Sequence, residues 1–87
     1  MRKRVVAHGR VQGVFFRDST RQRAESAGVA GWVANRLDGA VEAVFEGDAE
    51  AVEGLVRFME MGPGTADVER IEVDEEEPEG LSGFDVR

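Results

Sequence analysis

The sequence predicts an α+β protein, a two-layer sandwich in which an antiparallel sheet carries two helices on one face. Segments of strand and helix character follow one another in the order strand, helix, strand, strand, helix, strand. The length of 87 residues suits one domain, which we expect to span residues 1–87. The chain has no cysteine, so neither disulfide bonds nor a thiolate metal site can stabilise it.

The first half of the chain predicts a strand, a helix and a hairpin. Residues 4–8, RVVAH, are short and β-branched and are closed by a glycine, as a strand is. Helical spacing begins at about Phe16, and Gly28 follows where a helix end favours a left-handed residue. Residues 29–35 and 40–46 predict two strands joined by the Asp-Gly turn in RLDG.

The second helix is the most clearly patterned element. Apolar residues repeat at i, i+3, i+4 and i+7, and they are Val52, Leu55, Val56 and Met59. Asp48 is the expected N-cap, and the glycines and proline of residues 62–65 end the helix. An amphipathic helix of this kind is expected to cover the sheet with its apolar face.

The remaining residues predict one strand, a loop and a short final strand. Residues 66–74 read as a strand, and the three-residue step from Val68 to Ile71 predicts a bulge within it. The acidic residues 75–77 are interpreted as a solvated loop rather than a metal site. Residues 84–86 could form a last short strand.

This order of elements is the split βαβ, or ferredoxin-like, plan (βαββαβ). The helix between the first two strands is a crossover, so these strands run parallel and end at the same edge of the sheet. The segment GRVQGVFFR, residues 9–17, leaves the first strand at that edge, and Asn35 ends the second strand there. The topology therefore predicts that this segment and Asn35 are neighbours.

The segment at residues 9–17 has the composition of an anion-binding loop. Gly9 and Gly13 allow unusual backbone angles and leave amide groups uncovered. Successive N–H groups that lead into a helix N-terminus form a concave anion site, and Arg17 could add two parallel hydrogen bonds. The alternatives are an ordinary strand–helix connection with a surface arginine, and an Asn35 that serves the adjacent turn.

The net charge of −7 is unevenly distributed. Residues 1–28 carry +5 and residues 29–87 carry −12. The acidic majority argues against non-specific nucleic-acid binding, because phosphate backbones would be repelled. Lys3 is the only lysine, and the excess of arginine fits planar anion recognition, although a GC-rich genome or a salt-adapted proteome would give the same bias.

We expect a cytoplasmic monomer with no membrane association. No apolar run approaches the roughly 18 residues that a membrane helix needs. The basic start is followed by only three apolar residues, far fewer than a signal peptide requires. So highly charged a chain favours the monomeric state.

Residues 9–17, GRVQGVFFR, and 31–42, GWVANRLDGAVE, closely resemble the two signatures of the acylphosphatases, small enzymes of ferredoxin-like fold. The resemblance extends over the whole chain. It implies hydrolysis of a small-molecule acyl phosphate to a carboxylate and inorganic phosphate, with no metal or organic cofactor. The product phosphate is expected to inhibit competitively.

The resemblance also implies roles for individual residues. Arg17 would be the catalytic arginine that binds the phosphate, and Asn35 would hold the attacking water. The phosphate would lie in a cradle of backbone amides, those of Gln12, Gly13, Val14, Phe15 and Phe16. The only histidine, His8, is expected to have a structural role on a separate ground, because the alternation of the first strand places it either in the core layer or on the open sheet face.

Three alternatives remain at this point. The chain could be a non-catalytic module that keeps the anion cradle. RNA binding is disfavoured because the chain has no tyrosine and its third strand carries Glu42 and Glu46. A domain that begins a larger carbamoyl-transferring maturation factor is disfavoured because the chain is short and no zinc-type cysteines follow.

Overall fold

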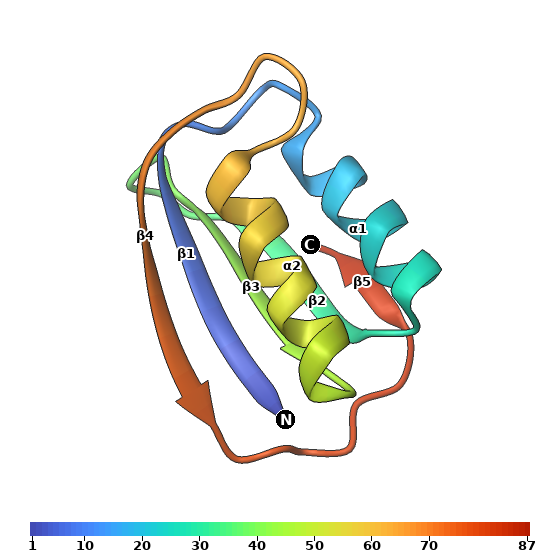
Figure 1. Ribbon diagram of the computed structural model, residues 1–87. Helices are drawn as coiled ribbons and strands as arrows, with labels where there is room; N and C mark the ends of the chain where they lie inside the picture. The colour runs from blue at the N-terminus through green and yellow to red at the C-terminus, as the bar shows by residue number, and fades with distance from the viewer.

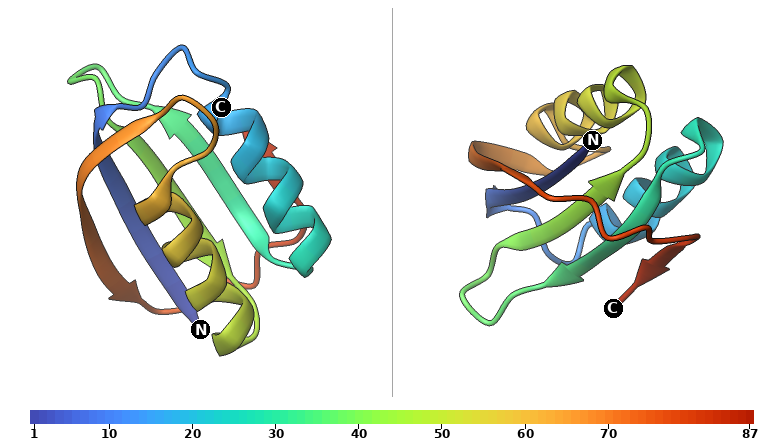
Figure 2. Two further views of the ribbon diagram at one scale, coloured as in Figure 1. Left: turned by 45° about the horizontal axis from the view of Figure 1, so that its top comes forward. Right: turned by 90° about the horizontal axis from the view of Figure 1, so that it is seen from below.

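The computed structural model describes residues 1–87 as a five-stranded sheet with two helices on one of its faces (Figure 1; Figure 2). The elements are β1 (Arg2–Arg10), α1 (Phe16–Ala27), β2 (Ala30–Asn35), β3 (Val41–Glu46), α2 (Ala49–Met61), β4 (Asp67–Glu76) and β5 (Phe84–Val86). The predicted fold class and element order are confirmed. Neither helix is long and apolar enough to cross a membrane.

The strands lie in the order β4-β1-β3-β2-β5. β3 pairs antiparallel with both β1 and β2, so β1 and β2 run parallel to each other, as predicted. β1 also pairs antiparallel with β4. The short strand β5 joins the free edge of β2 in parallel, with Val86 opposite Val33, and so makes the sheet mixed rather than wholly antiparallel.

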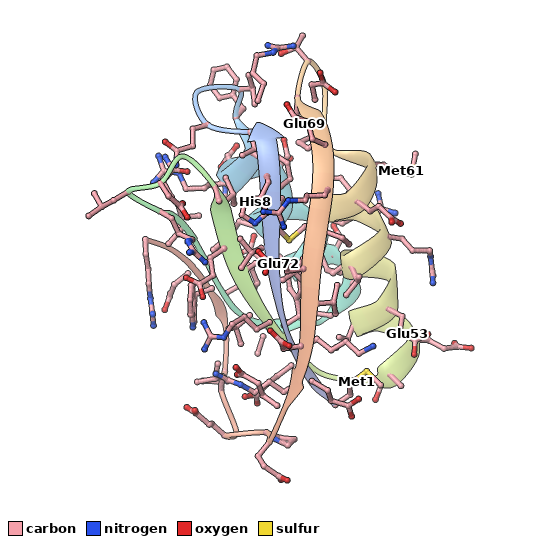
Figure 3. The ribbon with its side chains drawn as sticks, turned by 90° about the vertical axis from the view of Figure 1, so that its left-hand side faces the viewer. Met1, His8, Glu53, Met61, Glu69 and Glu72 are labelled. Carbon is pink, nitrogen blue, oxygen red and sulfur yellow. The ribbon has the colours of Figure 1, made fainter.

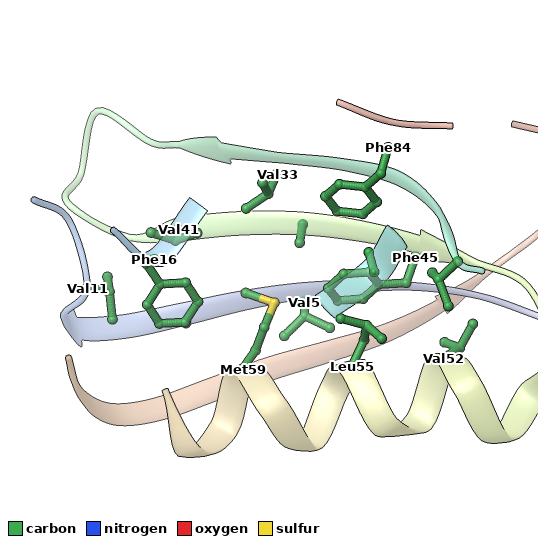
Figure 4. Packing of buried hydrophobic residues seen from close by; sticks show 14 residues of the cluster. Val5, Val11, Phe16, Val33, Val41, Phe45, Val52, Leu55, Met59 and Phe84 are labelled. Carbon is green, nitrogen blue, oxygen red and sulfur yellow. The ribbon is translucent and has the colours of Figure 1, made fainter. Parts of the chain in front are cut away.

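The core lies between the helices and the sheet face that they cover (Figure 4). It is a cluster of 14 buried apolar residues that come from the strands, both helices and the segments next to them. The rings of Phe45 and Phe84 stack with centroids 5.9 Å apart, which ties β5 to the middle of the sheet. Each fully buried apolar side chain of this size stabilises the fold by about 1.5–3 kcal/mol.

Helix α1 begins and ends where the sequence predicts. The Phe16 side chain is buried under the helix, and the Thr20 hydroxyl donates a hydrogen bond of 2.8 Å to the Phe16 carbonyl. The helix ends at Ala27, and Gly28 follows in the left-handed conformation (φ 70°). Asp48 is the N-cap of helix α2, as predicted, although its side chain makes no capping hydrogen bond.

The predicted bulge is present in β4. His8 lies opposite Arg70, whereas Gly9 lies opposite Val68, so Glu69 is the additional residue. At this point the two backbones approach so closely that a Cβ on Gly9 would lie 2.3 Å from the carbonyl oxygen of Asp67. A larger residue therefore cannot replace Gly9 without a shift of the backbone.

The interpretation of residues 75–77 as a solvated loop is wrong for the first two of them. β4 continues through Glu76, whose carboxylate accepts hydrogen bonds from the Nε atoms of Arg2 and Arg4 at 2.9 and 2.7 Å. The acidic end of β4 lies opposite the basic start of β1, and the arginines of β1 neutralise it. This pairing joins segments far apart in the sequence, so the local composition of residues 75–77 does not reveal it. No group of three or more His, Asp or Glu side chains is placed to hold a metal ion.

The sheet face away from the helices carries charged side chains. The His8 ring lies there, 2.5 Å from the Glu72 carboxylate of β4 (Figure 3). The guanidinium groups of Arg4 and Arg87 lie over the ring of Trp32 in β2, with their Cζ atoms 5.6 and 4.6 Å from the ring centroid. The sheet face that carries no helices is therefore lined by ion pairs and cation–π contacts.

Candidate active site

The connection between β1 and α1 presents a row of unpaired backbone amides. None of the N–H groups of residues 12–15 donates a hydrogen bond within the protein. The next two N–H groups, of Phe16 and Arg17, lie in the first turn of α1, where no helical carbonyl precedes them. Gly13 (φ 74°) and Phe15 (φ 59°) both adopt the left-handed backbone conformation. Such alternation of backbone angles is typical of anion-binding concavities.

Arg17 extends from the first turn of α1 toward the end of β5. Its Nη1 atom donates a hydrogen bond of 2.8 Å to the backbone oxygen of Arg87. Arg87 is itself held by a bond of 2.8 Å from its N–H to the carbonyl of Val33 in β2. Figure 2 shows this end of the chain beside the start of α1. The contact orients the guanidinium and leaves its other N–H groups available.

Asn35 is the exposed last residue of β2, and its carboxamide makes no hydrogen bond within the protein. The following turn is closed without it. The Arg36 N–H donates to the Ala40 carbonyl at 2.8 Å, and the Asp38 carboxylate accepts from the Ala40 N–H at 3.1 Å. This N–H and, secondly, Arg36 lower the pKa of Asp38. The alternative in which Asn35 serves the turn is therefore wrong, and its amide remains available to a ligand.

The loop, Arg17 and Asn35 meet at one cleft of about 290 Å³. The residues that line it are Val11, Gly13, Phe15, Phe16, Arg17, Asp18, Asn35 and Val86. The structure thus brings together five of the seven site residues that the sequence predicts. The predicted proximity of the loop to Asn35 is correct, because both follow strands that end at the same edge of the sheet.

Gln12 and Val14 are the two predicted site residues that do not line the cleft. The Gln12 side chain instead donates two hydrogen bonds, to the carbonyls of Arg36 at 2.8 Å and Ala40 at 3.0 Å. Val14 is half-buried against the core. Their N–H groups belong to the unpaired row, while their side chains fix the loop to the β2–β3 turn and to the core.

Three lining residues were not predicted from the sequence. Asp18 follows Arg17 directly, so its place in the first turn of the predicted helix could have suggested it. Val11 is fully buried and belongs to the core as well as to the floor of the cleft. The sequence does not indicate that Val86 lies at the cleft, because only the strand order of the folded sheet places β5 beside β2.

The cleft has one positive group and one negative group. Arg17 is the only cation among the lining residues, and Asp18 is the only carboxylate. The Asp18 oxygens are occupied by Arg21 at 2.7 Å and by Gln22 at 3.1 Å. His8 is not among the lining residues, and it bonds to Glu72 instead. The arrangement therefore suits one tetrahedral anion, held by a guanidinium and by backbone amides.

Known proteins resemble this chain in both sequence and fold. The acylphosphatase family model matches residues 3–86. An acylphosphatase of Rubrobacter xylanophilus is 62% identical over 87 residues, which cover 99% of this chain and 79% of that protein. The crystal structure of acylphosphatase from Bacillus subtilis superposes with a TM-score of 0.93 at 36% identity, covering 99% of this chain and 97% of the other.

A second solved structure, an acylphosphatase from Coxiella burnetii, has a TM-score of 0.94 at 38% identity and covers 99% of this chain and 90% of that one. Both the sequence and the fold thus match over almost the whole length of the chain. The chain belongs to the acylphosphatase family.

Proposed function

We propose that this member of the acylphosphatase family hydrolyses acyl phosphates with a phosphoryl group held by the loop amides and Arg17, and with a water molecule held by Asn35. The observation that carries the proposal is the convergence of three unused groups on one cleft. These groups are the unpaired N–H groups of the loop, of which those of Gly13, Phe15 and Phe16 belong to lining residues, the remaining N–H groups of Arg17 and the carboxamide of Asn35.

The chemistry needs little more than these groups. The leaving group of an acyl phosphate is a carboxylate, a weak base that departs without a proton, so a general acid is dispensable. What remains is to position the phosphoryl group, to offset its charge and to align the nucleophile in line with the breaking P–O bond. Backbone amides and one guanidinium supply the electrostatic part.

Asn35 orients the nucleophile rather than activating it. A neutral carboxamide cannot accept the proton of water, but its oxygen can accept a hydrogen bond and fix the direction of attack. The water oxygen forms a bond to phosphorus, and the P–O bond to the acyl group breaks with its electrons on the carboxylate. The water proton passes to a phosphate oxygen of the substrate, since no histidine or unpaired carboxylate lines the cleft.

A turnover assay tests the proposal. Benzoyl phosphate should be hydrolysed with release of inorganic phosphate, equally well with and without a metal chelator. Arg17→Gln should lower kcat/KM about 10²–10³-fold and raise KM, because it removes binding and transition-state stabilisation together. Asn35→Ala should mainly lower kcat. Arg23→Gln, an exposed residue of the same helix that lies outside the cleft lining, is the matched control.

The same assay separates the enzyme from a non-catalytic anion-binding module. A module would bind phosphate, and Arg17→Gln would weaken that binding, but no turnover would be seen. Inorganic phosphate should inhibit the enzyme competitively, because product and substrate use the same amides. Full activity in both the Arg17 and the Asn35 variants would contradict the site assignment even if the wild-type protein turns over substrate.

RNA binding is not favoured by the open face of the sheet. The outward residues of the central strands β1 and β3 include no phenylalanine, tyrosine or tryptophan, and the carboxylates of Glu42 and Glu46 lie among them. A small-molecule acyl phosphate remains the partner that the family implies. The monomeric state and the cytoplasmic location stay predictions.

A further inference from the structure

Phe15 is placed where the fold alone would favour another residue. It is the only non-glycine residue with a positive φ, at 59°, a conformation that is unfavourable for a bulky side chain. Its side chain is 82% exposed, so its ring gains little from packing. It precedes α1 without a side-chain capping bond. Glycine would meet the backbone requirement better, and the aromatic ring therefore has no structural explanation in the free protein.

The position of Phe15 relative to the cleft supplies an explanation. It lines the cleft on the side of the loop, and Val86, which is 42% exposed, lines it from β5. Arg17 and Asn35 are the polar groups of the same cleft. A phosphoryl group held by the polar groups leaves the attached acyl group to contact the apolar lining.

The charges near the cleft do not favour a second anionic group on the substrate. Arg17 is the only lining cation, and the loop amides and Arg17 are already assigned to the phosphoryl group. Arg36 pairs with Asp38 at 3.0 Å, and the Arg87 guanidinium lies over Trp32. Neither arginine is among the lining residues.

We propose that Phe15 and Val86 form a subsite for the acyl group, so that the enzyme favours acyl phosphates whose acyl group is uncharged and apolar, aromatic groups above all. This inference rests on the proposed function. The ring of Phe15 packs against the acyl group both before and during displacement of the phosphoryl group. Such a contact lowers KM more than it raises kcat.

The experiment compares kcat/KM for benzoyl phosphate with kcat/KM for acetyl phosphate. Phe15→Gly removes the ring and suits the left-handed backbone, while Phe15→Leu keeps an apolar side chain. The ratio should fall about threefold to tenfold in Phe15→Gly, mostly through KM for benzoyl phosphate, and should fall less in Phe15→Leu. Val86→Ala should lower it in the same direction.

Met61→Ala is the matched control, because Met61 is 81% exposed at the end of α2, where Figure 3 shows it, and is not among the lining residues. Its ratio should equal that of the wild type. An unchanged ratio in Phe15→Gly would overturn the subsite, and so would an equal fall in Met61→Ala. Failure of the wild-type protein to hydrolyse either substrate would instead overturn the proposed function.

Discussion

The guanidinium of Arg2 and the carboxylate of Glu46 form an ion pair of 2.7 Å on the sheet face away from the helices, and their side chains are only 5% and 8% exposed. The same carboxylate accepts the backbone N–H groups of residues 79–81 at 2.9–3.1 Å. This pair therefore anchors the connection between β4 and β5. That connection brings Val86 to the cleft and the Arg87 oxygen to Arg17.

Replacement of Glu46 should destabilise the protein strongly. Glu46→Gln leaves a buried Arg2 without one of its partners, although Glu76 at 2.9 Å and Glu79 at 3.5 Å remain. The free energy of unfolding should fall by about 2–4 kcal/mol, measured by urea denaturation. Glu75→Gln, an exposed residue of β4 with no ion pair, should change it by less than about 0.5 kcal/mol. Equal effects of the two substitutions would contradict the anchoring role.

The lowered pKa of the Glu46 carboxylate makes the stability of the protein depend on pH. The N–H of Glu79, and then Arg2 and the N–H groups of Leu81 and Gly80, lower the pKa of Glu46 from 4.5 to about 2, against the opposing effect of burial. The unfolded chain therefore binds the proton more readily, so this contribution is complete above about pH 4.5 and is lost as the pH falls toward 2. The loss amounts to at most about 3 kcal/mol.

Acid titrations of the wild type and Glu46→Gln test this dependence. The unfolding free energy of the variant should vary less between pH 4.5 and 2 than that of the wild type. Glu76 adds to the wild-type slope in the same direction, because Arg4 and then Arg2 lower its pKa. Identical pH profiles for the two proteins would show that Glu46 titrates normally in the folded state.

Replacement of Gln12 should impair activity more strongly than it impairs stability. Its Nε2 atom donates hydrogen bonds to the carbonyls of Arg36 and Ala40, and so links the anion-binding loop to the turn that follows Asn35. Gln12→Ala should reduce the unfolding free energy by about 1–2 kcal/mol but kcat by about 10–100-fold, because the water and the phosphoryl group lose their alignment.

Gln22→Ala is the control for this variant, since Gln22 bonds only to Asp18 on α1. It should leave kcat close to that of the wild type. Gln12→Glu provides a second test, because a carboxylate cannot donate to the two carbonyls and should be at least as damaging as alanine. Normal kcat in both Gln12 variants would show that the loop and the turn hold their places independently.

His8 should have no part in turnover. It bonds to Glu72 on the open face of the sheet and does not line the cleft. In His8→Asn, kcat should stay within about a factor of two of the wild type, with a flat pH–rate profile near neutrality. Circular dichroism would check that the variant is folded. A folded His8→Asn protein without turnover would contradict the structural role.

Much of the site was accessible from the sequence because its parts are local. Glycines in the first connection and an arginine in the first helical turn are read from neighbouring residues. The crossover rule adds one long-range fact, since parallel β1 and β2 must end at the same edge, and this places Asn35 beside the loop. The bulge at Glu69 was likewise visible as a break in the alternation of apolar residues.

The sequence by itself determined the order of the elements, the limits of α1 and the juxtaposition of Arg17 with Asn35. Only the tertiary structure decided that β5 pairs with β2, that the Gln12 side chain bonds to the turn and that Glu46 is buried beneath residues 79–81. The physical reason is the range of the interactions. Helix and strand patterns reflect contacts between near neighbours, whereas an edge strand and an ion pair depend on register between segments distant in the chain.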